Sequence, residues 1–83
     1  MQLPVLNQSL QLAIRGKTYT ATCVDLFDGG YGWYFDAVLP KNTRIRFKPG
    51  EQCTMPVPGA KCVVDFVGYP TNELWKVRFL IAK

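Results

Sequence analysis

Apolar and polar residues alternate with a period of two along most of this 83-residue chain. Leu10, Leu12 and Ile14 alternate with polar or small neighbours, and residues 75–81 repeat the pattern near the C-terminus. Such alternation places every second side chain on the same face of a strand and is typical of half-buried β-strands. No segment has the 3.6-residue apolar period of a helix, so the sequence predicts an all-β fold.

Turn residues divide this pattern into six predicted strands within a single domain, residues 1–83. Asp28–Gly29–Gly30 is a hairpin signal, because both glycines tolerate positive φ. Residues 50–59 contain two prolines and two glycines, which predicts a loop or at most a short edge strand at Cys53–Met55. Short strands joined by such turns indicate a small antiparallel β-barrel, whose closure removes exposed strand edges. The predicted strands are residues 10–15, 18–27, 31–38, 43–48, 62–67 and 74–81.

The composition argues against most enzymes. The chain has no histidine and its single serine is Ser9, so a Ser–His–Asp or Cys–His nucleophile cannot be assembled within it. Asp25, Asp28 and Asp36 lie near one hairpin, but their spacing favours neither an acid–base pair nor a calcium site. We therefore expect a non-catalytic binding module with no cofactor and no metal.

The cysteines and the lack of targeting segments predict a cytoplasmic protein. Cys23, Cys53 and Cys62 are odd in number and have no CxxC spacing, which makes a poor disulfide framework and a poor zinc motif. We expect three reduced thiols. The first ten residues do not form a signal peptide, and no apolar run approaches the roughly 18 residues of a membrane span.

The glycine-rich turn that follows Asp25 is the first candidate site. Gly29 and Gly30 can bring backbone amides close to a ligand, and nearby cations would favour a phosphate. The alternative is a plain hairpin whose glycines serve only the turn. The predicted ligand-binding residues are Arg15, Lys17, Asp25, Gly29 and Gly30.

The segment Asp25-x-Phe27-x-x-Gly30 resembles the D/N-x-S-x-x-G motif of the PilZ domain family, and the hydrophobic pattern over most of residues 9–82 is similar to that family. The resemblance implies a six-stranded antiparallel barrel. Members of the family bind cyclic di-GMP through this motif and a second one, RxxxR. This chain has no RxxxR motif, and Phe27 stands where the serine should be. The resemblance therefore implies an interaction module without tight cyclic di-GMP binding.

A row of basic residues is the second candidate site. The net charge is +4, and residues 41–83 carry it, because eight basic residues there oppose three acidic ones. Period two places the basic residues of each strand on one face, and two such strands facing the same way would form one patch. Such a patch could bind a single-stranded nucleic acid, whereas the alternative is an ordinary solvated outer face. The predicted patch comprises Arg44, Arg46, Lys48, Lys76 and Arg78.

The aromatic residues divide between predicted core and predicted surface. Tyr31 and Tyr34 have polar tips and are the better candidates for an exposed contact, stacking on bases if the ligand is a nucleic acid. A chain of this size needs large side chains to fill its interior. The aromatic residues expected in the core are Trp33, Phe35, Trp75 and Phe79.

Apolar residues on the face opposite the core suggest a third function, a protein-interaction adaptor or homodimer. An uncovered apolar face of this kind would be buried by a protein partner or by a second copy of the chain. The residues expected on that face are Val63, Val67, Leu74 and Leu80.

Overall fold

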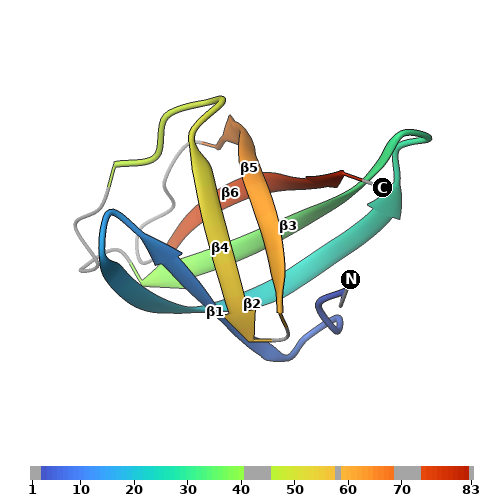
Figure 1. Ribbon diagram of the computed structural model, residues 1–83. Coiled ribbons are helices and arrows are strands. Elements are labelled where there is room, and N and C mark those ends of the chain that lie inside the picture. The colour runs from blue at the N-terminus through green and yellow to red at the C-terminus, as the bar shows by residue number, and fades with distance from the viewer. Residues whose placement is uncertain (1–2, 41–45, 58, 69–73, 83) are drawn as a thin grey trace.

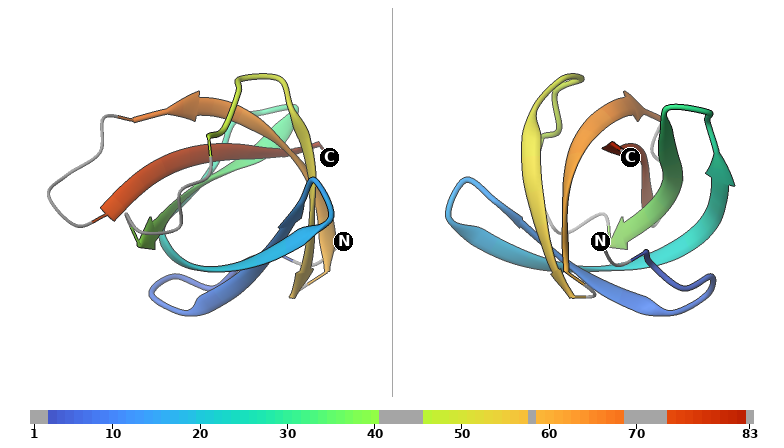
Figure 2. Two further views of the ribbon diagram at one scale, coloured as in Figure 1. Left: turned by 90° about the vertical axis from the view of Figure 1, so that its left-hand side faces the viewer. Right: turned by 45° about the vertical axis from the view of Figure 1, so that its right-hand side comes forward.

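The computed structural model describes residues 3–40, 46–57, 59–68 and 74–82, without the side chains of Leu74 and Trp75. Neighbouring strands are antiparallel and follow the order β1-β2-β3-β6-β5-β4, with β4 returning to β1 (Figure 1 and Figure 2). The strands close into a barrel, so the predicted all-β, six-stranded antiparallel barrel is confirmed. The strands are β1 Ser9–Ile14, β2 Lys17–Asp28, β3 Gly32–Pro40, β4 Gln52–Val57, β5 Ala60–Val67 and β6 Leu74–Ala82.

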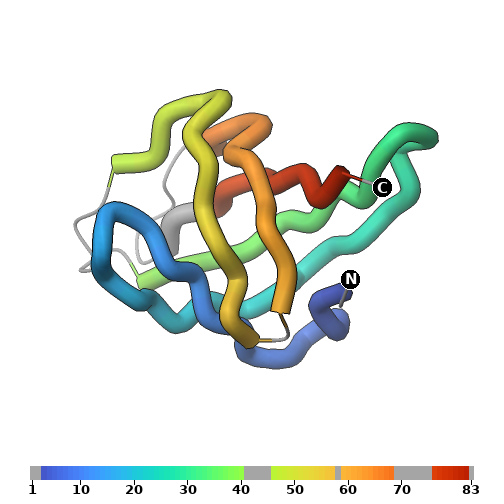
Figure 3. The backbone as a smooth tube through the Cα atoms, viewed as in Figure 1, coloured from blue at the N-terminus to red at the C-terminus, as the bar shows by residue number. Residues whose placement is uncertain are grey.

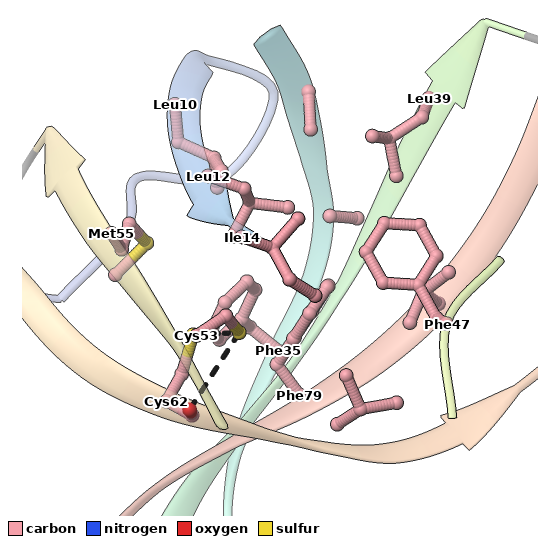
Figure 4. Close-up of a cluster of buried hydrophobic side chains, with 14 of the residues drawn as sticks. Leu10, Leu12, Ile14, Phe35, Leu39, Phe47, Cys53, Met55, Cys62 and Phe79 are labelled. Atoms are coloured by element: carbon pink, nitrogen blue, oxygen red, sulfur yellow. Dashed lines mark hydrogen bonds between the residues drawn. The ribbon is translucent and has the colours of Figure 1, made fainter. Parts of the chain in front are cut away.

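The core fills the barrel with alternate residues from each strand, as period two requires. Phe35 and Phe79 are fully buried, and their rings stack with centroids 5.0 Å apart. Phe47 meets Phe79 edge-on at 5.9 Å (Figure 4). The prediction that Phe35 and Phe79 lie in the core is confirmed. Trp33 packs against the core from a partly buried position, and the side chain of Trp75 lies outside the described residues.

The predicted strand at residues 43–48 is wrong where it can be compared. Residues 43–45 lie outside the described part of the chain, and residues 46–48 form no strand. Phe47 is buried and its two neighbours are exposed because Phe47 alone turns inward onto Phe79. A single inward side chain between two basic residues therefore imitates strand alternation.

The sixth strand is β4, which lies where a loop or short edge strand was expected. It pairs with β5 over the four residue pairs from Gln52–Val63 to Met55–Ala60, and with β1 on its other side. Proline is tolerated here because Pro56 falls in the register irregularity between the β1–β4 pairs, where no regular ladder hydrogen bond is required. Strand β4 is therefore a full member of the barrel.

Gly32 allows β3 and β6 to approach closely next to the β2–β3 turn. A Cβ atom on this buried residue would lie 2.5 Å from Leu80 Cδ1 and 2.9 Å from the carbonyl oxygen of Ile81. We expect Gly32→Ala to lower the free energy of unfolding by about 1–3 kcal/mol, because the backbone must shift to make room. Urea denaturation measures this loss, and an unchanged midpoint would contradict it. Ala82→Ser, at the exposed position opposite Gly32, is the control and should change stability by no more than about 0.5 kcal/mol.

Candidate functional site

The predicted ligand-binding residues fall at opposite ends of the molecule. Arg15 lies in the β1–β2 turn and Lys17 begins β2, whereas Gly29 and Gly30 form the turn after this twelve-residue strand. Figure 3 shows the two turns on opposite sides of the backbone. Asp25 lies on the part of β2 that leads to the glycine turn. The structure therefore does not bring Arg15 and Lys17 to the glycine turn.

The amide groups of the glycine turn are used within the hairpin. The N–H of Gly29 donates to the carbonyl oxygen of Gly32 at 2.8 Å, and the N–H of Gly30 donates to the Asp28 carboxylate at 2.8 Å. An anion would have to displace these partners to bind the two amides. The geometry favours the alternative of a plain hairpin at this turn.

Four of the five residues in the predicted basic patch are described by the structure. Arg46 and Lys48 are exposed and precede β4, whereas Lys76 and Arg78 lie on the outer side of β6. Arg44 lies outside the described residues. The patch thus draws on two separate segments, and the two β6 cations already have an acidic partner.

That partner is Asp36 of β3, which is 1% exposed. Arg78 forms a two-pronged contact with it, Nε to Oδ1 at 2.7 Å and Nη2 to Oδ2 at 3.1 Å. Lys76 Nζ lies 3.7 Å from Oδ2. The hydrogen bonds to Asp36 raise the pKa of Arg78, so the guanidinium stays charged. The β6 cations therefore neutralise a buried acid, which leaves less of their charge for a phosphate.

A row of apolar side chains crosses the outside of four neighbouring strands. Phe27 of β2 lies opposite Tyr34 of β3, Tyr34 lies opposite Leu80 of β6, and Leu80 lies opposite Val63 of β5. Leu26, next to Phe27, and both sequence neighbours of Tyr34, Leu80 and Val63 pack in or against the core, so the row itself faces outward. The rings of Phe27 and Tyr34 stack with centroids 5.4 Å apart. The row is thus continuous across β2, β3, β6 and β5.

A β-bulge adds Phe66 to this surface. The register of β5 against β6 shifts between Val64 and Phe66, so that Phe66 pairs with the outward-facing Arg78 and is 57% exposed. The guanidinium of Arg78 also lies over the ring of Phe27, 4.9 Å from its centroid. We call this surface the outer aromatic face, and define it as Phe27, Tyr34, Val63, Phe66 and Leu80.

The same bulge corrects one expectation from the sequence. Val67 was expected on the face opposite the core, but it packs against the core. The extra residue in the bulge exchanges inside and outside along the rest of β5. Val63 precedes the bulge and pairs with Leu80 of β6. Both residues lie on the outer side, as expected. The side chain of Leu74 lies outside the described residues.

The tyrosines extend the outer aromatic face towards the tip of the β2–β3 hairpin. Tyr31 is 74% exposed, and its hydroxyl lies 3.5 Å from that of Tyr34. The hydrogen bond between them raises the pKa of Tyr34, so this side chain is neutral at physiological pH. Tyr31 is therefore exposed, as its polar tip suggested, whereas Tyr34 is partly buried.

No group of three acidic or cysteine side chains that could hold a metal ion occurs in residues 3–40, 46–57, 59–68 and 74–82. Within the same described part of the chain, no helix is long and apolar enough to cross a membrane. The chain matches no protein-family model, no curated protein and no solved structure.

Proposed function

We propose that this chain is a non-catalytic interaction module that binds a short apolar segment of a partner protein on its outer aromatic face. The observation that carries the proposal is the cross-strand row of Phe27, Tyr34, Leu80 and Val63. Contiguous exposed apolar patches are uncommon on folded domains and are often binding sites. The row lies on four neighbouring hydrogen-bonded strands of the closed barrel, so little ordering of the backbone would oppose binding.

The size of the face favours a short segment over a second copy of the chain. Four neighbouring strands about 4.8 Å apart span roughly 15–20 Å. The cross-strand row together with Phe66 therefore covers only about a few hundred Å². A stable protein–protein interface buries about 800 Å² on each partner. A peptide-like segment with aliphatic or aromatic side chains fits the smaller area.

The charge around the face favours a protein over a nucleic acid. Asp36, Asp25 and Asp65 all lie close enough to act on the charge of Arg78. Lys76, on the same side of β6, also pairs with Asp36. Phosphates near Arg78 would meet these carboxylates, so electrostatic attraction of a nucleic-acid backbone is weak at this end of the face.

A matched pair of glutamate substitutions tests the proposal. Phe66 is 57% exposed on the outer aromatic face, and Val57, at the far end of β4, is 48% exposed. Immobilised wild-type protein and both variants are presented with a random peptide display library, and the selected peptides are titrated. We expect Phe66→Glu to weaken their binding at least tenfold, because it places a charge in an apolar contact, and Val57→Glu to leave binding unchanged.

Equal binding to the wild type and Phe66→Glu would overturn the proposal. So would salt-sensitive binding of a single-stranded oligonucleotide that Arg46→Glu abolishes, which would favour the basic residues. A concentration-dependent dimer mass in light scattering that Phe66→Glu removes would favour the homodimer. Thermal melts of the variants check that each is folded.

A further inference from the structure

Two cysteines lie directly opposite one another on β4 and β5. Cys53 and Cys62 are register partners in the antiparallel ladder, and their sulfur atoms are 3.0 Å apart (Figure 4). Directly opposed residues of antiparallel strands have Cα atoms about 4.5–5.5 Å apart, which is within the range that a disulfide bridges. The third cysteine, Cys23, lies on β2 and donates to the carbonyl oxygen of Asp25 instead.

We propose that Cys53 and Cys62 form a site of reversible oxidation, at which a small peroxide converts the two thiols into a cross-strand disulfide. The sulfurs need to approach by only about 1 Å to reach bonding distance. The strand backbones already face each other in register, so the barrel accommodates the bond without changing its strand order.

The two thiols are unequal, which assigns them different roles. The hydrogen bond between them lowers the pKa of Cys53 and raises that of Cys62 well above its ordinary value. Cys53 is also the more exposed of the two, 7% against 3%, and since the thiolate is the nucleophile, we assign the attack on the oxidant to Cys53. Cys62 then acts as the resolving thiol.

The strand segments that carry the pair border an open groove. It has a volume of about 710 Å³ and is lined by residues of β1, β4, β5 and β6, Cys53 and Cys62 among them, and both cysteines also belong to the buried core. Cys53 is 7% exposed and Cys62 is 3% exposed, so a molecule as small as hydrogen peroxide is favoured over a bulky disulfide reagent.

The chemistry balances in two steps. The Cys53 thiolate attacks one oxygen of hydrogen peroxide, so that an S–O bond forms and the O–O bond breaks; the leaving hydroxide takes up the Cys53 proton as water. Cys62 then attacks the Cys53 sulfenic acid, so that the S–S bond forms and the S–O bond breaks, and the second hydroxide leaves with the Cys62 proton. The two cysteines lose two electrons, and the peroxide is reduced to two waters. A dithiol reductant reverses the change.

The test treats the folded protein with stoichiometric hydrogen peroxide and counts free thiols by alkylation and intact mass. We expect the count to fall from three to one, with the mass of two hydrogen atoms lost before alkylation, and a peptide map to contain Cys53 joined to Cys62. The melting temperature should rise by about 10 °C, because the bond closes a short loop in the unfolded chain, and a dithiol should restore the original value.

Cysteine variants separate this site from general thiol oxidation. Cys23→Ala should behave as the wild type does, whereas Cys62→Ala should stop at a sulfenic acid on Cys53 that dimedone traps. Three titratable thiols after treatment, a bond that includes Cys23, or a disulfide between two molecules would each overturn the proposal. These outcomes can be read on the wild-type protein alone, so they do not depend on the folding of a variant.

Discussion

Phe79→Ala is expected to lower the free energy of unfolding by about 3–5 kcal/mol, the usual loss for removing a buried phenylalanine. Phe79 is fully buried, stacks on Phe35 at 5.0 Å and meets Phe47 edge-on at 5.9 Å. Its removal would leave a cavity next to Phe35 and Phe47. Domains of this length have about 4–12 kcal/mol of stability, so the variant should lose a large share of it.

Urea denaturation followed by near-ultraviolet circular dichroism measures this loss. Phe66→Ala is the matched control, because Phe66 is 57% exposed and its removal should change stability by no more than about 0.5 kcal/mol. A loss below about 1.5 kcal/mol at Phe79 would mean that the barrel interior is not packed as described. Phe66→Ala also separates the two roles of phenylalanine in this chain, since it removes surface area for binding without affecting the core.

Arg78→Met should lower the free energy of unfolding by about 2–3 kcal/mol, because it leaves the carboxylate of Asp36 buried without its two-pronged partner. Methionine retains much of the apolar stem of the side chain, so the substitution removes mainly the charged guanidinium. The expected loss is below the 3–5 kcal/mol typical of a broken buried pair, because the Arg78 side chain is 38% exposed and Lys76 remains 3.7 Å from the carboxylate.

Two further variants test the same pair. Lys76→Met should cost no more than about 1 kcal/mol, since this lysine is more exposed and forms a longer contact. The double variant Arg78→Met with Asp36→Leu should recover most of the lost stability, because no charge is then left buried. If Arg78→Met and Lys76→Met cost the same, the bidentate contact does not contribute as proposed. Equilibrium urea denaturation at neutral pH gives all three values.

The sequence predicted five of the six strands closely, because alternation and turn residues both act locally. The fourth strand was predicted at residues 43–48 because Ile45 and Phe47 alternate with basic residues there. Strand β4 instead lies at Gln52–Val57, where the sequence predicted a loop or at most a short edge strand. The true strand was obscured by prolines and glycines, and Pro56 is compatible with it only because β4 meets β1 in an irregular register. That register depends on closure of the barrel, which no local pattern encodes.

The candidate site was predicted less completely, for similar reasons. Val63 and Leu80 were recognised as apolar residues opposite the core. Phe66 was missed and Val67 was misplaced, because the bulge in β5 is visible only in the hydrogen-bonded ladder. Asp36 and Arg78 are 42 residues apart, so their pairing, which occupies much of the predicted basic patch, could not be read from spacing.

Closure of the barrel also determines how the protein can aggregate. Strand addition, the common route to edge-to-edge aggregation, requires an unpaired strand edge, and the contact of β4 with β1 covers one edge of each of these two strands. The β1–β4 seam is also where the register is interrupted. Opening of this seam would expose two edges at once and allow a hairpin to be exchanged between copies. The rate of aggregation should therefore follow the rate at which the β1–β4 seam opens. Aggregation should begin before the core unfolds.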